Sequence, residues 1–421
     1  MKLVVTVLEE SCESAIEVIR AIALPHDMVE VRAERFGTFD FDALRAATVK
    51  PMIFTWRGSP RPDPLPVRLG EGTLIDVEWR EGIVIDDPVR TVLSHHDYEG
   101  MADVEEIMAK MEALGCAHTK LAASPRTFAD NERLLRLLPP TATRQPPTTV
   151  IGMGERGLYS RILAPFRGSE LAFVAAGNIA APGQLTLERA LEIYGKRPQK
   201  AERVFAVAGN PAGHSLSPVI HNRLFRAKKV PAAYTIASIE RFEEIAGAFL
   251  RGEPCGLSVT TPFKEDAFAF AHEHAENARR ARAVNTLVNV NGTIIADNTD
   301  VDGFAALIGA PAGRLHSRAA VLGAGPTARA ALVALEDARI PATVYNRANM
   351  HTLRDFDGDL IISTLPADAE VAIPRCRTYI EAAYSGGPRS VDAERRFSGL
   401  DLLQAQAVRQ HELFMKAFDG L

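Results

Sequence analysis

The stretch GCAHTKLAAS, residues 115–124, places Lys120 inside a short strand of mostly apolar residues. A buried amine loses its hydration, and this loss costs free energy unless the fold makes use of the amine. Apolar character over so few residues is typical of a strand in a parallel sheet that is covered on both faces. We therefore predict a buried parallel strand here and treat Lys120 as a candidate catalytic residue.

Seven further runs of this kind occur in the first half of the chain, at intervals of roughly two dozen residues. Several intervals suit amphipathic helices, but 58–71 is rich in proline and 80–88 is too short for a good helix. Eight β/α units that close on themselves form a (β/α)8 barrel, so we predict a trimmed barrel. The predicted strands are LVVTVL (3–8), MVEVRA (28–33), PMIFTWR (51–57), GTLIDVEW (72–79), VRTVLSH (89–95), AHTKLAA (117–123), TTVIGMG (148–154) and ELAFVAAG (170–177).

The composition, with 47% hydrophobic and 24% charged residues, is ordinary for a globular protein, and 421 residues allow two or three domains. A net charge of −5 gives no reason to expect a nucleic acid or a membrane as partner. We expect a cytoplasmic protein with no targeting segment, no membrane span and no metal site. Its four cysteines match no zinc or CxxC spacing and are expected to be reduced: Cys12, Cys116, Cys255 and Cys376.

A polar linker, YGKRPQKAER (194–203), separates the barrel from a second α/β region. In that region Asn291-Gly292 favours a type I′ hairpin turn. A third segment begins near 318 with a strand, a glycine turn and a helix, and a last helix closes the chain. These changes of pattern predict boundaries at 1–197, 203–314, 315–400 and 401–421.

Charged side chains stand at the ends of several predicted barrel strands, where barrel enzymes carry their reactive groups. Cations, acids, a histidine and a lysine together suit an anionic substrate with a carbonyl group. A lysine can attack a ketone to form a Schiff base, and a histidine can then move protons. Any one of these residues alone is more often structural. The set is Glu30, Arg32, Arg57, Asp76, Glu78, His95, His96, Lys120 and Met153, followed by Arg161 and Gln184 in the last two loops.

The barrel motifs resemble, in order and spacing, those of type I 3-dehydroquinate dehydratase over residues 1–195. They are VEVRAERF, IFTWR, LIDVEW, LSHHDY, HTKLAA, MGERGLYSR and AAPGQL. The resemblance implies that Lys120 forms an imine with 3-dehydroquinate and that His96 is the general acid and base for the elimination of water. It also implies that five side chains hold the substrate, the arginines as bidentate clamps. They are Glu30, Arg32, Arg57, Arg161 and Gln184.

Two positions depart from that family's pattern. The glutamate that orients the family's histidine is replaced by Arg61, and Asp63 and Glu78 are the candidates to take its place. The serine of the family's lid motif is replaced by Ala180, which removes one contact to the substrate.

The second half resembles shikimate dehydrogenase through GNPAGHSLSPVIHN, SVTTPFK, AVNT and NTDVDG, again in the right order. Taken locally, the two serines of the first motif suit a helix cap, and Lys264 with Asp300 suits a surface salt bridge. The resemblance implies instead that Lys264, paired with Asp300, protonates the substrate oxygen while NADPH gives hydride to the 3-keto carbon. The implied shikimate pocket comprises Ser215, Ser217, Thr260, Asn285, Asp300 and Gln406.

VLGAGPTARA (321–330) follows a predicted strand and opens a helix, which is the context in which a glycine-rich turn binds a dinucleotide. TVYNRAN (343–349) lacks the acid that binds a ribose 2′-hydroxyl, and its Asn-Arg pair indicates NADP. Few residues separate this motif from DLIISTLP, so one βα unit of the Rossmann domain is predicted to be missing. The expected cofactor-binding residues are Gly323, Ala324, Gly325, Pro326, Thr327, Ala328, Asn346 and Arg347.

These resemblances predict a bifunctional shikimate-pathway enzyme of the α/β class. A (β/α)8 TIM barrel is fused to a two-lobed shikimate dehydrogenase with a shortened Rossmann NADP domain. The expected partners are small molecules, namely 3-dehydroquinate, 3-dehydroshikimate and shikimate, and a homodimer is left open. Two alternatives remain: a C-terminal half that only binds quinate or shikimate, and a metabolite-sensing regulator.

Overall fold

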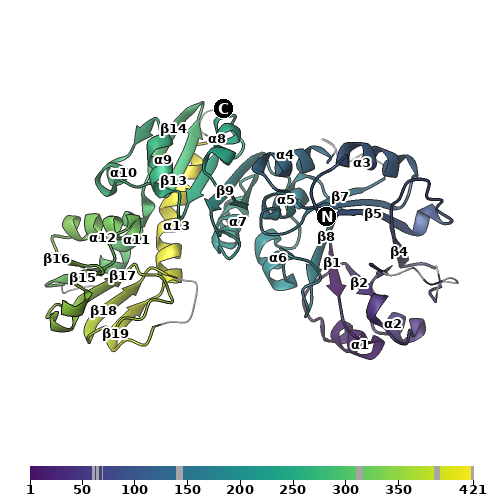
Figure 1. Ribbon diagram of the computed structural model, residues 1–421, viewed down its shortest axis with the longest axis horizontal. Coiled ribbons are helices and arrows are strands. Elements are labelled where there is room, and N and C mark those ends of the chain that lie inside the picture. The colour runs from purple at the N-terminus through teal and green to yellow at the C-terminus, as the bar shows by residue number, and fades with distance from the viewer. Residues whose placement is uncertain are drawn as a thin grey trace. The chain divides into compact units, whose positions relative to one another are not determined.

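Eight parallel strands form the barrel sheet, in the order β7-β6-β5-β4-β3-β2-β1-β8 (Figure 1). Glu170 N donates to Thr148 O at 3.0 Å between β8 and β7, so the sheet nearly closes. Each predicted strand segment overlaps an observed strand, which confirms the barrel. The strands are β1 (Lys2–Val7), β2 (Met28–Arg32), β3 (Met52–Thr55), β4 (Thr73–Glu78), β5 (Thr91–Asp97), β6 (His118–Ala123), β7 (Thr148–Gly152) and β8 (Leu171–Ala175).

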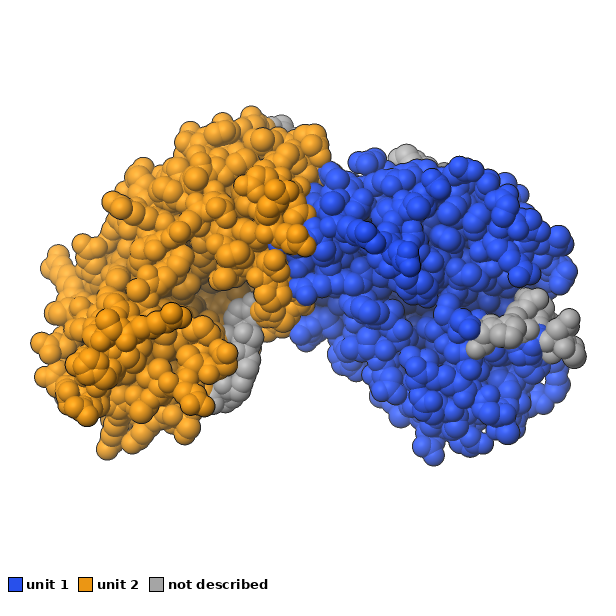
Figure 2. Space-filling view, viewed as in Figure 1, with its two compact units in different colours: residues 1–202, 225–239 blue, residues 203–224, 240–421 orange. Residues whose placement is uncertain are grey.

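The two parts of the computed structural model are coloured separately in Figure 2. It describes residues 1–58, 62, 66–68, 70–138, 146–309, 316–383 and 389–418. The barrel unit comprises Met1–Glu202 and Phe225–Ile239, and the second unit comprises Arg203–Leu224 and Glu240–Leu421. None of the helices in these described ranges is long and apolar enough to cross a membrane. The four cysteines are buried free thiols.

Helices of the barrel unit begin where the sequence supplies caps. Ser11 and Ser14 form a capping box at α1, and Thr127 and Asp130 form one at α4. The described part of 58–71 contains no helix, and only a short 3-10 helix joins β4 to β5. The barrel is therefore trimmed around β4, as predicted. The helical elements are α1 (Cys12–Ala21), η1 (Ala33–Arg35), α2 (Phe41–Ala46), η2 (Pro88–Arg90), α3 (Val104–Ala113), α4 (Phe128–Arg136), α5 (Leu158–Leu163), η3 (Ala164–Arg167) and α6 (Leu187–Tyr194).

One strand that follows the barrel in sequence packs on barrel helix α5. It is β10 (Ala232–Ser238), which α7 (Ser217–Lys228) precedes. Thr235 Oγ1 donates to Tyr159 O at 3.0 Å, and Ser238 Oγ donates to Glu155 Oε1 at 2.9 Å. These contacts account for the place of this segment in the barrel unit.

The first sheet of the second unit places its strands in the order β9-β11-β13-β14-β12. β9 and β11 are parallel, whereas β13 and β14 form an antiparallel hairpin. Asn291 and Gly292 both have positive φ, 51° and 88°, as the predicted hairpin turn requires. The elements are β9 (Arg203–Gly209), α8 (Glu243–Leu250), β11 (Gly256–Val259), α9 (Lys264–Phe270), β12 (Glu273–His274), α10 (Glu276–Ala281), β13 (Thr286–Val290), β14 (Thr293–Asp297) and α11 (Thr299–Gly309).

The second sheet of this unit is parallel throughout, in the order β16-β15-β17-β18-β19. A six-stranded dinucleotide-binding sheet has the order 3-2-1-4-5-6. Here β16 lies at the edge and only the 3-10 helix η4 leads from it to β17, so the third strand of that order is missing. The shortened Rossmann domain is thereby confirmed. Its elements are β15 (Ala319–Leu322), α12 (Pro326–Asp337), β16 (Ala342–Tyr345), η4 (Met350–Asp355), β17 (Leu360–Ser363), β18 (Cys376–Glu381) and β19 (Ala393–Phe397), and α13 (Gly399–Met415) follows them.

Helix α13 packs against the first sheet of the second unit at a position that only glycine allows. A Cβ on Gly256 of β11 would lie 2.7 Å from Phe205 Cδ1 and 2.7 Å from Phe414 Cδ1. The two rings are in contact, with centroids 4.8 Å apart. Because Gly256 has no side chain, β11 can pack closely against Phe205 of β9 and Phe414 of α13.

We expect Gly256→Ala to lower the free energy of unfolding of the second unit by about 1–3 kcal/mol, because the added methyl overpacks this contact. Hydrogen exchange of peptides that cover β11 measures the change. Gly309→Ala is the matched control, because nothing lies within 4 Å of a Cβ added there. Equal protection in the two variants would contradict the packing argument.

Candidate active site

One cavity of about 110 Å³ lies toward the carboxyl ends of the barrel strands. The seven barrel residues that the sequence predicts for catalysis or substrate binding all line it, although the chain separates them widely. A lysine, a histidine, three arginines, a glutamate and a glutamine thus surround one space. They are Glu30, Arg32, Arg57, His96, Lys120, Arg161 and Gln184.

Lys120 lies on β6, and its residue is only 4% exposed. Its Nζ is 3.2 Å from Asp76 Oδ2 and 3.8 Å from Glu30 Oε1. The same nitrogen lies 4.1 Å from the centroid of the Phe173 ring. The amine is therefore held between two acids and an aromatic face, at the wall of the cavity.

Asp76 is the buried acid that connects Lys120 to its surroundings. Its Oδ1 accepts from Arg57 Nη2 at 2.8 Å and from Ser94 Oγ at 2.6 Å. Burial acts to raise the pKa of Asp76, but the positive charges of Lys120 and Arg57 outweigh it and hold the pKa well below its usual range. Asp76 is therefore an ionised carboxylate with a cation on each side.

Glu30 is the second acid next to the amine. Thr6 Oγ1 and Thr55 Oγ1 donate to its two oxygens at 2.8 and 2.9 Å. Burial acts to raise the pKa of Glu30, yet the charges of Lys120 and Arg32 bring it below the usual value. Both acids next to Lys120 are therefore ionised at neutral pH.

Two of the three arginines already bind carboxylates of the barrel. Arg57 pairs with Asp76 and with Glu78. Arg32 pairs with Glu34, with Nη2 and Oε1 2.5 Å apart. In this arrangement their guanidinium groups hold neighbouring side chains in place.

Arg161 differs, because it pairs with no carboxylate among the residues that the structure describes. Its Nε donates to Gly152 O at 2.7 Å, and the residue is 9% exposed. Burial lowers the pKa of Arg161 to about 10, so the guanidinium is charged at neutral pH. A buried cation that lines a cavity without a counter-charge is suited to a carboxylate of a ligand.

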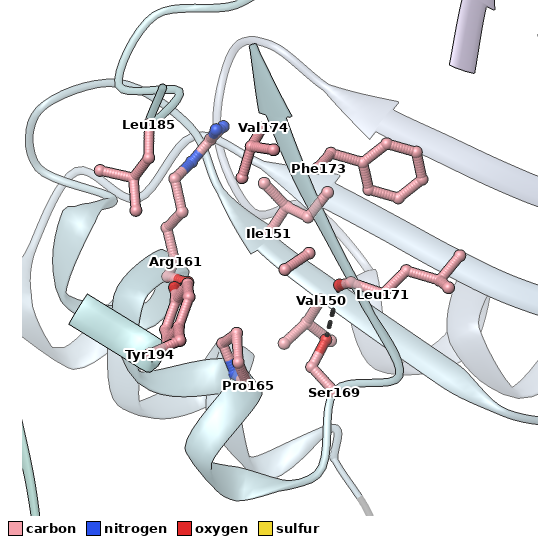
Figure 3. A pocket seen from close by; sticks show the side chains of 11 residues that line it. Val150, Ile151, Arg161, Pro165, Ser169, Leu171, Phe173, Val174, Leu185 and Tyr194 are labelled. Carbon is pink, nitrogen blue, oxygen red and sulfur yellow. Dashed lines mark hydrogen bonds between the residues drawn. The ribbon is translucent and has the colours of Figure 1, made fainter. Parts of the chain in front are cut away.

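A smaller cavity of about 20 Å³ lies on the other side of Arg161, with room for one water. Figure 3 shows the Arg161 side chain extending from α5 past the ring of Tyr194. Arg161, Ile151 and Phe173 line both cavities. The buried Arg161 side chain is thus bordered by both cavities.

His96 is the candidate general acid and base. Its ring Nδ1 lies 2.9 Å from Glu78 Oε2, and its backbone N donates to Glu78 Oε1 at 2.8 Å. The ring stacks on Tyr98, with centroids 5.9 Å apart. Burial and the positive charges of Lys120 and Arg57 depress the pKa of His96 well below 6.5, so its ring is neutral.

The neighbouring His95 lies apart from this cavity. Its ring meets Trp79 edge-on, with centroids 5.8 Å apart, and the residue does not line the cavity. Of the positions considered for orienting the catalytic histidine, Arg61 and Asp63 lie outside the described residues. Glu78 is the one that the structure brings into contact with His96.

Sequence reasoning missed the uncharged residues of this site. Neither their type nor their spacing marks them, and each is recognised only by the neighbour that it contacts. Asp76 carried a signal as an acid near the end of a predicted strand but was not assigned a role, whereas Glu78 was one of two candidates to orient the histidine. The missed residues are Thr6, Thr55, Ser94, Tyr98 and Phe173.

The second unit contains a buried lysine–aspartate pair. Lys264 Nζ donates to Asp300 Oδ2, and each residue is 8% exposed, so this is no surface salt bridge. Asn285 Nδ2 donates to Asp300 Oδ1 at 2.8 Å and to Gln406 Oε1 at 3.1 Å. The structure therefore brings four of the predicted residues together from three separate motifs and the last helix.

The remaining predicted pocket residues lie near the start of α7 and the end of β11. Ser215 Oγ accepts from Ser217 N at 3.2 Å, which is the local capping contact that the sequence favours. Thr260 N donates to Ala208 O at 3.0 Å. No hydrogen bond between described residues joins these three side chains to the Lys264–Asp300 pair. A further residue, Gln410, accepts from Ser258 Oγ at 2.7 Å and was not predicted.

The glycine-rich segment has the geometry that a dinucleotide pyrophosphate needs. Gly323 ends β15 with φ of +106°, and a Cβ there would lie 2.5 Å from Thr364 Oγ1. Gly325 is the N-cap of α12, with Pro326 after it, so free backbone N–H groups begin at this point. Thr327 Oγ1 lies 3.5 Å from Lys264 Nζ. The segment therefore fits the predicted cofactor and begins beside the buried pair.

The other predicted cofactor contacts follow β16 or lie within the same turn. Asn346 Oδ1 accepts from Ala348 N at 2.9 Å, which closes a turn, and Arg347 is exposed. Ala324 is exposed in the turn, and Ala328 is buried on α12. Arg347 is thus the one charged side chain of the predicted cofactor set.

Comparison with known families finds matches to two parts of the chain. Residues 3–200 match the type I 3-dehydroquinase family, and residues 207–287 match the shikimate dehydrogenase substrate-binding domain. The barrel is thus similar to type I 3-dehydroquinases, and the region that follows it is similar to the substrate-binding domain of shikimate dehydrogenases. This result agrees with the resemblances in the sequence motifs.

Two of the relatives are multifunctional proteins by name. The bifunctional 3-dehydroquinate dehydratase/shikimate dehydrogenase of Arabidopsis thaliana is 28% identical over 320 residues, which cover 68% of this chain and 53% of that protein. The pentafunctional AROM polypeptide of Yarrowia lipolytica is 28% identical over 448 residues, which cover 93% of this chain and 28% of that protein. The chain thus spans about half the length of the plant relative.

The dehydroquinate dehydratase and shikimate dehydrogenase from S. pombe AroM is a solved structure similar to this chain. The match covers 98% of this chain and 95% of that one, with 22% identity and a TM-score of 0.42.

We expect the ring of His96 in the dehydroquinase domain to stay neutral at pH 6.5, because burial and nearby cations depress its pKa. Below pH 6.5 the folded state then binds fewer protons at this site than the unfolded chain, so protonation lowers stability as the pH falls. NMR titration of histidine-labelled protein measures the pKa, with His96→Asn to assign the signal. Half-protonation at or above pH 6.5 would contradict the expectation.

Proposed function

We propose that the chain is a bifunctional shikimate-pathway enzyme. The barrel dehydrates 3-dehydroquinate to 3-dehydroshikimate, and the second unit reduces 3-dehydroshikimate to shikimate with NADPH. The observation that supports the first activity is that one cavity is lined both by a buried amine, Lys120, and by the guanidinium of Arg161, which pairs with no carboxylate among the described residues. A substrate with a ketone and a carboxylate satisfies both groups at once.

The dehydration begins when Lys120 gives a proton to His96 and its free amine attacks the ketone carbon. His96 returns that proton to the oxygen of the adduct, and the oxygen leaves as water to give a protonated imine. His96 then takes the proton from the carbon next to the imine. The electron pair of that bond forms the new double bond, and the hydroxyl on the following carbon leaves with a proton from His96. Water hydrolyses the imine, which releases 3-dehydroshikimate and restores Lys120.

Different residues of the cavity are proposed to bind different groups of the substrate. Arg161 receives the substrate carboxylate as a bidentate clamp. Glu30 accepts hydrogen bonds from the substrate hydroxyls, and Gln184 can accept from them or donate to them. Arg32 and Arg57 complete the cationic wall, while their internal ion pairs fix the acids around the amine.

In the second unit, Lys264 is the proposed proton donor for reduction. Its Nζ gives a proton to the carbonyl oxygen as that oxygen becomes a hydroxyl, and Asp300 holds the ammonium in place. Asn285 and Gln406 fix the carboxylate of Asp300. Ser215, Ser217 and Thr260 are proposed to bind the substrate's carboxylate and hydroxyls.

NADPH, when bound, supplies the hydride for this step. The turn and helix start from Gly323 to Ala328 would hold its pyrophosphate. Asn346 and Arg347 would hold the 2′-phosphate, which distinguishes NADP from NAD. The contact of Thr327 with Lys264 supports this placement, because it joins the cofactor segment to the proton donor.

Three further assignments belong to this proposal. The domain boundaries are 1–197, 203–314, 315–400 and 401–421, with the last helix returning to the substrate domain. The compartment is the cytoplasm, which the free buried cysteines support. A homodimer is the proposed assembly, and sedimentation of the purified chain tests it.

Borohydride in the presence of 3-dehydroquinate is expected to trap a covalent adduct on Lys120, because reduction fixes the imine. Mass spectrometry of the digested protein locates the adduct. Lys120→Ala should lose the adduct and reduce kcat by roughly 10⁴-fold or more. Lys110→Ala, which changes an exposed lysine of α3, is the control and should behave as the parent protein. No adduct in the parent protein would rule out the imine.

Oxidation of NADPH with 3-dehydroshikimate is expected, and Lys264→Ala should slow it by about 10²- to 10⁴-fold because the proton donor is lost. Absorbance at the NADPH band follows the reaction, and Lys228→Ala, an exposed lysine of α7, is the control. Absence of turnover with retained binding of shikimate would favour a second unit that binds without catalysis. Absence of both turnovers with retained binding would favour a regulator.

A further inference from the structure

We propose that Glu78 is the positioning residue for His96, fixing the orientation of its ring and its tautomer; this inference rests on the proposed dehydration. The observation is that one carboxylate contacts the histidine at two places. Glu78 Oε1 accepts from the backbone N of His96 at 2.8 Å, and Oε2 lies 2.9 Å from ring Nδ1. Two contacts from one rigid group leave the imidazole little freedom to rotate.

The same contact selects the tautomer. A carboxylate only accepts hydrogen bonds, so Nδ1 must carry the proton that lies between Glu78 and His96. A neutral imidazole has one N–H, and Nε2 is then left with a lone pair. His96 is thus prepared as a base at Nε2, which is the atom that the dehydration needs.

The strand register puts Glu78 where it can do this. Glu78 of β4 pairs with Ser94 of β5, and Ser94 pairs with Lys120 of β6. Because alternate residues of a strand share a face, His96 follows Ser94 on the side of the cavity. Acid, histidine and lysine therefore stand at neighbouring levels of three successive strands.

Arg57 explains how a partly exposed acid is held still. The Glu78 side chain is 43% exposed, whereas that of Asp76 is 1% exposed. Arg57 binds both carboxylates, and Asp76 is in turn fixed by Ser94 and Lys120. Because the planar guanidinium of Arg57 contacts both acids, the fixed position of Asp76 also restricts the motion of Glu78.

Other charged groups also face His96, so the test must separate the effect of Glu78 from theirs. Lys120, Arg57, Asp76 and Glu30 all act on its charge. A change of rate alone could come from any of them. The tautomer of the free protein reports only on which ring nitrogen has a hydrogen-bond acceptor, so it isolates the contact with Glu78.

The experiment is Glu78→Gln, with ¹⁵N NMR of His96 in the free protein and kinetics with 3-dehydroquinate. We expect the proton to redistribute from Nδ1 toward Nε2, and kcat to fall by roughly 10- to 100-fold, as for other groups that orient a reacting histidine. KM and the borohydride adduct on Lys120 should be retained. Glu81→Gln is the matched control, because Glu81 is an exposed acid just after β4 that pairs with Lys110 at 2.9 Å.

A second variant, Glu78→Asp, keeps the charge but is one methylene shorter. It therefore cannot reach both the backbone N and the ring Nδ1 of His96. The same shift of tautomer is expected, and this variant also serves if Glu78→Gln does not fold. An unchanged tautomer, with kcat equal to that of Glu81→Gln, would overturn the proposal. If the tautomer shifts but the parent protein does not dehydrate 3-dehydroquinate, the proposed function fails while the positioning role stands.

Discussion

The ion network around Asp76 is the constraint on which the barrel site depends. One buried carboxylate binds Lys120 on one oxygen and Arg57 and Ser94 on the other. These residues come from β4, β6, the end of β3 and β5, so a single acid links four neighbouring strands. Removing one partner of a buried pair costs roughly 3–5 kcal/mol, because the other charge is left uncompensated. The network therefore fixes the amine and the geometry of the cavity together.

The balance of charge within the cavity explains what a ligand must bring. Lys120, Arg57 and Arg32 have acids of the protein next to them, whereas Arg161 has none among the described residues. A carboxylate ligand completes the set without adding an uncompensated charge to a buried site. This division is why Arg161, rather than the better paired arginines, is the proposed partner of a substrate carboxylate.

The second unit shows how a dinucleotide domain can be shortened and still keep its central parts. The missing strand is the one at the outer edge beyond β16. The turn after β15, the start of α12 and the contact of Thr327 with Lys264 are all at the centre of the sheet and are retained. Loss of an edge strand removes outer support from the adenosine side, where only Arg347 supplies charge among the predicted contacts. The deletion therefore bears on the proposed binding of NADPH more than on the Lys264–Asp300 pair.

The sequence by itself determined the barrel and the shortened Rossmann domain, and it marked the candidate reacting residues. Strand number follows from local apolar runs, and a barrel brings strand ends to one rim whatever lies between them. Only the tertiary structure decided which charges pair. Arg57 binds internal acids, Arg161 binds none among the described residues, and Glu78 contacts His96. These pairings depend on strand register and on rotamers of residues distant in the chain. Local sequence patterns do not contain that information, because an ion pair across strands is set by three-dimensional position and not by spacing.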